Sequence, residues 1–313
     1  MSQPAGWPRI AVVGSGAVGG YFGGMLARAG APVVFIGRPA FVAAVKDEGL
    51  LLDTTALRER VPVTASADLA AARGAEVVLF CVKTTDTRET ARALAPLLPP
   101  EALVLSLQNG VDNAETIREA SGIAALPAAV YVAASVPSPG TVKHLGRGDL
   151  VLGPRSPATE RLAALFARAG VAVRIADDLT AELWTKLVWN CALNAISALG
   201  NSTYGEILAS EEARALLEGA LDEVLAVAAA AGVALPAFAE RGAALSGAYQ
   251  VASQMAATRS STAQDLMRGK KTEIDSLNGF IVRRGRALGV PTPVNHALYT
   301  LVRLAESASP RPR

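Results

Sequence analysis

The chain contains little of what builds metal centres or disulfide frameworks. Among its 313 residues there are only two cysteines and two histidines. Cys81 and Cys191 lack the short spacing of metal-binding or redox cysteine pairs. We therefore expect no bound metal and two buried free thiols, in a protein that works in the reducing cytoplasm.

Long apolar runs and an excess of one charge are also absent. The longest apolar stretch, residues 224–239, is Ala-rich and is interrupted by Gly232 and Pro236, so it falls short of a membrane span. The first ten residues lack a basic region followed by an apolar core, and we expect no signal peptide. A net charge of +2 argues against nucleic acid or an acidic membrane surface as a partner.

What the chain does have is an apolar majority, with 51% apolar and 19% charged residues, as globular proteins do. Its length favours two domains. Strand and helix patterns alternate up to Asp177 and Asp178, and only helical patterns follow. We therefore predict an α/β protein, with a Rossmann-type dinucleotide-binding domain over residues 1–176 and an all-helical substrate and dimerisation domain over residues 177–313.

A glycine-rich turn joins the first predicted strand, residues 10–13, to a helix over residues 21–29, and a second strand follows at residues 32–36. The glycines fit the G-x-G-x-x-G pattern, which predicts a dinucleotide site when it links a strand to a helix. The N–H groups at the start of such a helix bind a pyrophosphate. The residues of the predicted turn are Gly14, Ser15, Gly16, Ala17, Val18 and Gly19.

The residue that ends the second strand distinguishes NAD from NADP. NAD enzymes place an acid there for the ribose 2′-hydroxyl. This chain has Arg38 at that point, and the nearest acid, Asp47, lies well into the next helix. A guanidinium attracts a 2′-phosphate, so we predict NADPH/NADP+ as the cofactor. An ordinary surface arginine is the alternative.

Two polar residues follow later strands. Lys83 follows a predicted strand at residues 76–82, and Asn109 follows one at residues 103–107. Ligands of open parallel sheets bind outside the carboxyl ends of the strands. We expect Lys83 to add positive charge beside Arg38 and Asn109 to contact nicotinamide and substrate. A solvated loop lysine and an Asn-Gly turn are the alternatives. Further strands are predicted at residues 128–134, 141–145, 150–153 and 171–175, with a helix at residues 158–169.

One helix, residues 181–200, organises the second half. Lys186, Asn190 and Asn194 are spaced at i, i+4 and i+8, so they line one side of a mostly apolar helix. An ammonium and two amides there cost stability unless they meet polar partners. We interpret them as a polar ladder that holds a small polar ligand, with a solvated polar face as the alternative. The other predicted helices span residues 211–231, 236–248, 263–267, 273–288 and 293–306.

A nicotinamide enzyme that reduces a carbonyl needs a group that gives a proton to the forming alkoxide. His144 and His296 have no recognisable catalytic neighbour, and no Tyr-x-x-x-Lys pair is present. Lys186 remains as the candidate acid, with Glu273 as a carboxylate that would aim it. By local reasoning alone, Glu273 is equally a first-turn acid of its predicted helix.

Ser261 begins S-T-A-Q, which fits a capping box that it closes with Gln264. Capping is one interpretation of Ser261, and substrate binding is the other.

These motifs together resemble the ketopantoate reductase (2-dehydropantoate 2-reductase) family. The likeness runs from Ile10 to Glu306. The motifs that carry it are GSGAVGG, Arg38, Lys83, LQNG at residues 107–110, LWTKLVWNCALN at residues 183–194 and TEIDSLNG at residues 272–279. The resemblance implies a helical domain similar to 6-phosphogluconate dehydrogenase C-terminal-like domains. It also implies NADPH-dependent reduction of ketopantoate to pantoate, on the route to pantothenate and coenzyme A.

The resemblance further implies roles for individual residues. Lys186 would be the proton donor, with Glu273 beside it and the cofactor. The 2′-phosphate would bind Arg38 and Lys83. The nicotinamide side would be lined by Asn109, which also contacts substrate, and by Ala134. The substrate's hydroxyl end would bind Asn190 and Asn194, and its carboxylate would bind Ser261.

The chain departs from the family pattern after the long helix, and alternatives to the implied function follow from the sequence. Some family members have a further substrate-facing Asn after the long helix, where this chain has Tyr204. Another 2-oxo acid on the same scaffold is therefore an alternative substrate. A non-catalytic NADPH-binding regulator is an alternative from another class, although it has no need for Lys186. The Ala-rich carboxyl half favours a homodimer.

Overall fold

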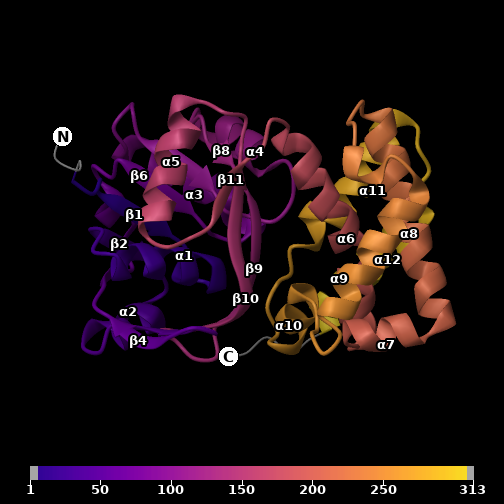
Figure 1. Ribbon diagram of the computed structural model, residues 1–313, viewed down its shortest axis with the longest axis horizontal. Coiled ribbons are helices and arrows are strands. Elements are labelled where there is room, and N and C mark those ends of the chain that lie inside the picture. The colour runs from indigo at the N-terminus through magenta and orange to yellow at the C-terminus, as the bar shows by residue number, and fades with distance from the viewer. Residues whose placement is uncertain (1–5, 309–313) are drawn as a thin grey trace. The chain divides into compact units, whose positions relative to one another are not determined.

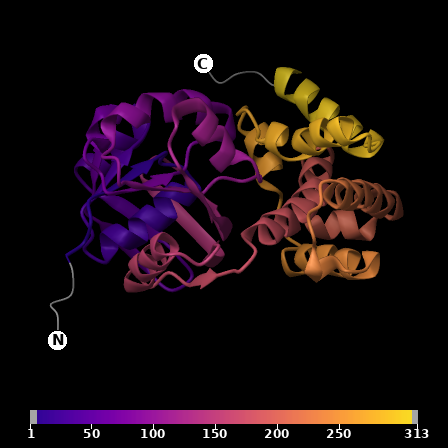
Figure 2. The same cartoon turned by 90° about the horizontal axis from the view of Figure 1, so that it is seen from above.

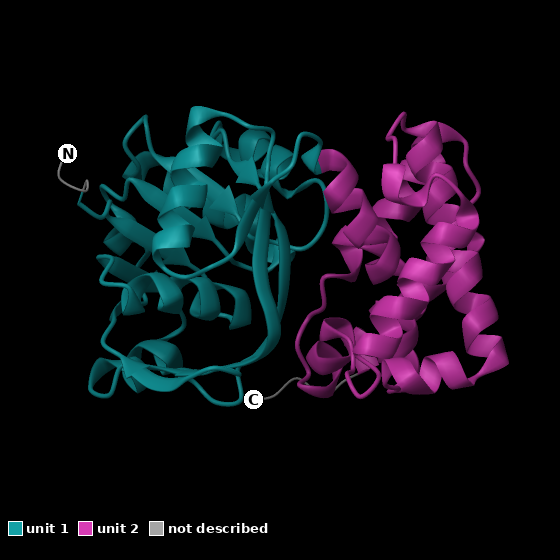
Figure 3. Cartoon of the chain, in the orientation of Figure 1, with its two compact units in different colours: residues 1–179 teal, residues 180–313 magenta. Residues whose placement is uncertain are grey.

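The computed structural model describes residues 6–308 and divides into two compact units, Met1–Leu179 and Thr180–Arg313 (Figure 3). The first unit combines sheets with helices, and the second is helical (Figure 1). This confirms the predicted fold class. Within the described range, none of the helices has the length and hydropathy needed to cross a bilayer.

A six-stranded sheet forms the centre of the first unit. Its strand order is β5-β2-β1-β6-β7-β8, and every neighbouring pair is parallel. Side chains alternate along β1, so Ile10 and Val12 join one apolar cluster while Ala11 and Val13 join another. The sheet is thus buried on both faces, as parallel sheets are. The strands are β1 (Ile10–Val13), β2 (Val33–Ile36), β5 (Thr64–Ser66), β6 (Val77–Phe80), β7 (Leu103–Ser106) and β8 (Leu126–Pro127).

Helices supply the apolar partners on both faces. Phe22 on α1 and Phe166 on α5 are fully buried and meet edge to face at 6.1 Å between ring centroids. Burying a phenylalanine side chain contributes about 1.5–3 kcal/mol. On the opposite face, Leu94 of α3 and Ile117 of α4 are fully buried. The helical segments of this unit are α1 (Ala17–Arg28), α2 (Pro39–Lys46), η1 (Leu69–Ala72), η2 (Thr84–Asp86), α3 (Thr87–Leu94), η3 (Ala95–Leu97), α4 (Asn113–Ser121) and α5 (Pro157–Arg168).

A second sheet of the first unit differs from the sequence prediction. The two strands predicted between residues 141 and 153 are one strand, β10, whose pairing with β9 is irregular near Arg147 and Gly148. These residues have φ angles of 56° and 122°, so the backbone bends without ending the strand. The sequence analysis also missed two strands here, β3 and β4. The sheet contains β3 (Leu50–Asp53), β4 (Arg58–Val61), β9 (Ala129–Ser135), β10 (Thr141–Leu152) and β11 (Val173–Ile175).

The second unit contains helices and no strand within the described residues (Figure 2). Its first helix, α6 (Leu179–Gly200), runs as predicted. The predicted helix over residues 273–288 is interrupted, because Leu277 leaves helical geometry with φ −110° and ψ −107°. The remaining segments are α7 (Tyr204–Ala209), α8 (Glu211–Ala230), η4 (Pro236–Phe238), α9 (Arg241–Gln254), α10 (Ser261–Met267), η5 (Ile274–Ser276), α11 (Asn278–Leu288) and α12 (Pro293–Ala308).

Buried hydrogen bonds fix α6 against the other helices of its unit. The side-chain amide of Asn278 donates to the carbonyl of Cys191, 3.1 Å away, and to Asn295 Oδ1, 2.9 Å away. Asn295 in turn donates to the carbonyl of Ala220 and to Glu223. Because buried amides are costly without partners, this network fixes how α6, α8, α11 and α12 pack together.

The two cysteines are free. Cys191 is buried and Cys81 is half-buried. Burial raises the pKa of both thiols, so neither is the low-pKa thiolate of a reactive cysteine.

Candidate active site

The glycine turn passes close to the end of β6. Gly14 has a φ of +108°, and a Cβ there would lie 2.6 Å from the carbonyl carbon of Cys81. A Cβ on Gly19 would lie 2.1 Å from the carbonyl oxygen of Gly14, so both positions require glycine. A Cβ on Gly16 would meet no described atom within 4 Å, which leaves this side of the turn open. Gly16 also begins α1 without a side-chain cap, an arrangement that suits anion binding.

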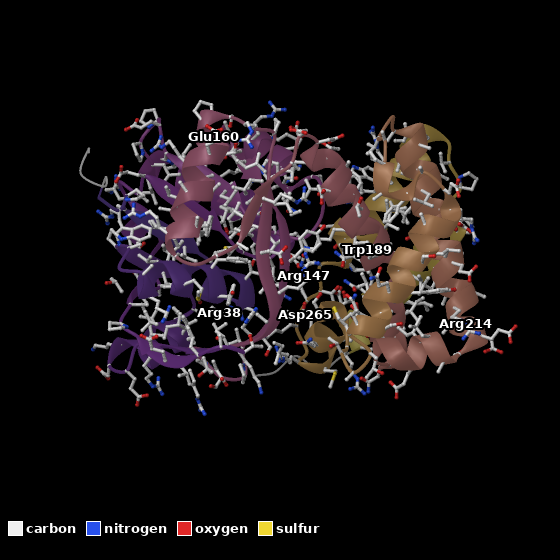
Figure 4. All side chains as sticks on the ribbon, in the orientation of Figure 1. Arg38, Arg147, Glu160, Trp189, Arg214 and Asp265 are labelled. Atoms are coloured by element: carbon white, nitrogen blue, oxygen red, sulfur yellow. The ribbon has the colours of Figure 1, made fainter. Side chains whose placement is uncertain are left out.

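Arg38 lies beside this turn. A Cβ on the preceding residue, Gly37, would lie 2.2 Å from Ser15 Oγ, so the backbone before Arg38 packs directly against the glycine turn. Arg38 is exposed at the start of α2 (Figure 4). Within residues 6–308, its guanidinium forms no salt bridge. The structure thus brings together an arginine and an open glycine turn.

The loops that carry Lys83 and Asn109 are tied together by Gln108. The Gln108 side chain is 5% exposed and donates to the carbonyl of Val82, 2.9 Å away, and to Thr87 Oγ1, 2.8 Å away. These bonds join the end of β7 to the end of β6. Lys83 directly follows Val82, and Asn109 directly follows Gln108, so the bonds place the two loops side by side.

The carbonyl of Asn109 is held as well. It accepts a hydrogen bond from the side-chain amide of Asn113, 2.6 Å away at the start of α4. Asn113 is buried. Sequence reasoning gave no role to Gln108 or Asn113, although Gln108 lies inside the LQNG motif.

Ala134 lies on the second sheet of this unit. It is half-buried on β9, where it pairs with His144 of β10. The same sheet packs against α1, and a Cβ on Gly20 would lie 2.5 Å from Val142 Cγ2. Ala134 is therefore carried by a different sheet from the strands that lead to Lys83 and Asn109.

In the second unit, α6 carries the polar ladder at the predicted spacing. Lys186 and Asn190 are half-buried, and Asn194 is only 5% exposed. Trp184, two residues before Lys186, packs edge to face on Phe280 with 5.7 Å between ring centroids. The ladder thus runs from half-buried positions into the core of the unit.

Asn194, the deepest residue of the ladder, has a partner that the sequence analysis did not identify. The hydroxyl of Tyr204, on α7, donates to Asn194 Oδ1 over 3.1 Å. Tyr204 is 7% exposed, and this burial raises the pKa of its phenol. The hydroxyl therefore keeps its proton and acts as a donor.

The structure corrects the predicted cap at Ser261. The N-cap of α10 is Ser260, whose hydroxyl accepts from the N–H of Ala263 over 3.0 Å. The same hydroxyl donates to the backbone carbonyl of Asn194 over 2.9 Å. Ser261 is the first helical residue and is exposed. The Ser261 hydroxyl is thus not needed as the cap, and the residue that precedes it, Ser260, is bonded to Asn194.

Glu273 lies in a segment that α12 holds from both sides. It is half-buried and immediately precedes η5, so it is not in the first turn of an α-helix. On one side, the N–H and hydroxyl of Thr272 both donate to a carboxylate of α12 over 2.6 Å. On the other side, Asp275 accepts a hydrogen bond from the hydroxyl of Tyr299 over 2.7 Å and forms a salt bridge with Arg303. The three residues of this α12 clamp are Tyr299, Arg303 and Glu306.

Comparison with known proteins shows the family to which this chain belongs. The model of "Ketopantoate reductase PanE/ApbA" matches residues 10–157, and the model of "Ketopantoate reductase PanE/ApbA C terminal" matches residues 178–306. The chain belongs to the ketopantoate reductase family.

Individual relatives cover almost the whole chain. A 2-dehydropantoate 2-reductase of Halobacterium salinarum is 32% identical over 308 residues, which are 95% of this chain and 99% of the relative. One of Pyrobaculum aerophilum is 36% identical over 300 residues, covering 95% and 98%. The crystal structure of a PanE/ApbA family ketopantoate reductase from Ralstonia eutropha JMP134 has a TM-score of 0.91 and 48% identity, covering 96% of this chain and 99% of that one.

Proposed function

We propose that this ketopantoate reductase family member is an NADPH-dependent 2-dehydropantoate 2-reductase, which reduces ketopantoate to pantoate on the route to pantothenate and coenzyme A. The observation that carries the proposal is the ladder on α6. One ammonium and two amides run along a helix whose inner end is buried. Such a costly arrangement fits a helix that receives a small polar substrate.

The cofactor assignment rests on the first unit. The open glycine turn fits a pyrophosphate, and Arg38, exposed and without a salt bridge among the described residues, fits a 2′-phosphate. Lys83 adds a positive charge beyond β6. We propose Asn109, Ala134 and Glu273 as residues on the nicotinamide side. When bound, NADPH supplies the hydride.

The protein's own part in the reaction is to bind the acid and to give a proton. Lys186 donates its ammonium proton to the oxygen of the former oxo group, which becomes a hydroxyl. The carboxylate of Glu273 aims that ammonium. Asn190 and Asn194 bind the hydroxyl end of the acid, and Ser261 binds its carboxylate. The overall reaction consumes one NADPH and one proton for each hydroxy acid formed.

A second candidate keeps this chemistry and changes the substrate. Tyr204 bonds to Asn194 in this chain, so the hydroxyl end of the substrate site has a different lining from one built of asparagines. Another branched or hydroxylated 2-oxo acid is therefore the alternative substrate.

The proposal assigns a different role to each of the two units. Residues 1–176 bind the dinucleotide, and residues 177–313 bind the substrate and form a homodimer in the cytoplasm. Leu301 and Leu304, on one side of α12, are 50% and 60% exposed, which supports an interface there.

Growth of a bacterial strain that lacks its own ketopantoate reductase, and so requires pantothenate, tests the proposal. The gene for this protein should restore growth without pantothenate, and the Lys186→Ala variant should not. We would also check that the wild type and the variant accumulate and bind NADPH, because this distinguishes a loss of catalysis from a failure to fold. Failure of the wild-type protein to restore growth, despite accumulation and NADPH binding, would contradict the assignment of ketopantoate.

A further inference from the structure

Tyr204 is held more firmly than a residue at the start of a short helix needs to be. Its backbone N–H donates to the carbonyl of Thr258 over 3.0 Å, and the next N–H, of Gly205, donates to the carbonyl of Ala256 over 2.9 Å. Thr203 and Glu206 form a reciprocal capping box around it. Backbone, cap and burial together fix the direction in which the phenol points.

The contact that this phenol makes settles the orientation of Asn194. An asparagine amide offers an oxygen that accepts and a nitrogen that donates. Because the neutral Tyr204 hydroxyl donates to Oδ1, the amide nitrogen is turned away from Tyr204. The backbone of Asn194 is held independently by Ser260. Among the described residues, Asn194 Nδ2 donates no hydrogen bond.

This nitrogen is not one of the fully buried atoms that lack a partner, so it is open to solvent, and a ligand oxygen can take the place of water as its acceptor. All 2-oxo acids share the carboxylate and the oxo oxygen, so a further oxygen distinguishes an acid that carries one from an apolar acid of similar shape. We infer that Tyr204 is a specificity-determining positioning residue. By occupying the Asn194 acceptor, it makes Asn194 a donor-only contact that selects 2-oxo acids with a further oxygen acceptor, such as a hydroxyl.

This inference rests on the proposed function and names how its substrate is chosen. The test compares ketopantoate with trimethylpyruvate, which differs from it only by lacking the hydroxyl. Steady-state kinetics with NADPH are measured for the wild type, Tyr204→Phe, Asn194→Ala and the double variant. Tyr249→Phe is the matched control, because it removes a hydroxyl of the same unit that donates to Glu218 on α8.

Tyr204→Phe should raise KM for ketopantoate about threefold to tenfold, the loss typical of one neutral hydrogen bond. Its kcat, its KM for trimethylpyruvate and its affinity for NADPH should stay within about twofold of wild type. In the Asn194→Ala background the same change should have no further effect, because coupled residues are not additive. Tyr249→Phe should behave as wild type.

A second variant keeps the test informative if Tyr204→Phe folds poorly. Asn194→Asp retains an acceptor for Tyr204 but has no N–H donor and adds a negative charge, so it should raise KM for both acids and raise KM for ketopantoate more. Equal increases for both acids, unchanged KM in Tyr204→Phe, or the same Tyr204→Phe effect with and without Asn194 would overturn the inference. Absence of ketopantoate turnover by the wild type would instead contradict the proposed function and remove the inference with it.

Discussion

The side-chain amide of Gln108 donates a hydrogen bond to the carbonyl of Val82 over 2.9 Å, and this bond joins the ends of two neighbouring parallel strands. Gln108→Leu would leave that carbonyl and the hydroxyls of Ser106 and Thr87 without their partner. We expect the free energy of unfolding to fall by about 1–3 kcal/mol, with weaker NADPH binding. Urea unfolding measures the first effect and fluorescence titration the second. Gln254→Leu, at an exposed helix end, should change stability by less than about 0.5 kcal/mol.

Arg38→Asp should move cofactor preference from NADPH toward NADH. The change removes a guanidinium that suits a 2′-phosphate and introduces a charge that repels it. We expect the ratio of kcat/KM for NADPH to that for NADH to fall about 10- to 100-fold, as loss of a charged hydrogen bond of about 1.5–3 kcal/mol would give. Arg73→Asp, an exposed position in the same unit with the same charge change, should leave the ratio unchanged. An unchanged ratio in Arg38→Asp would mean that another group recognises the phosphate.

Lys186→Ala should lower kcat by about 10²–10⁴-fold, the usual loss on removing a general acid. NADPH affinity should stay near the wild-type value, because the proposed cofactor contacts lie mainly on the first unit. Pre-steady-state NADPH oxidation separates the chemical step from product release. Near-normal turnover would remove Lys186 from the role of proton donor.

The α12 clamp should matter for catalysis although none of its residues is proposed to touch the substrate. Glu306→Ala leaves the N–H and hydroxyl of Thr272 without their acceptor. Because Glu273 follows Thr272 directly, we expect a lower kcat with little change in KM for NADPH. Glu306→Gln keeps an acceptor and should recover most of the activity. Glu240→Ala, an exposed carboxylate in the same unit, is the control. Equal activity of Glu306→Ala and wild type would show that the clamp does not position Glu273.

The sequence predicted the features of the fold that depend on the spacing of residues along the chain. The glycine turn between β1 and α1 and the ladder on α6 depend on spacing along the chain, and both appear where the sequence placed them. The prediction divided strand β10 between residues 145 and 150, whereas the backbone bends at Arg147 and continues. Strand β4 was missed because its sequence, RERV, is largely charged and exposed.

The contacts that complete the candidate site are those that the sequence did not reveal. Asn194 meets Tyr204 across a turn, and Thr272 meets Glu306 from a helix 34 residues further along the chain. Neither pair has a motif, because both depend on how helices pack. For the same reason Ser260, and not Ser261, is the cap of α10. Packing against α6 gives Ser260 a second partner, the carbonyl of Asn194.

The measurement that tests the central proposal most directly is the steady-state rate of NADPH oxidation by the purified protein with ketopantoate, beside a panel of other 2-oxo acids, with the product identified by mass spectrometry. We predict rapid turnover with ketopantoate, pantoate as the product, and a lower kcat/KM for every other acid tested. A higher kcat/KM for a different acid would support the proposed reaction but contradict ketopantoate as the substrate. Tight NADPH binding without turnover of any acid would contradict the proposal and favour a cofactor-binding regulator.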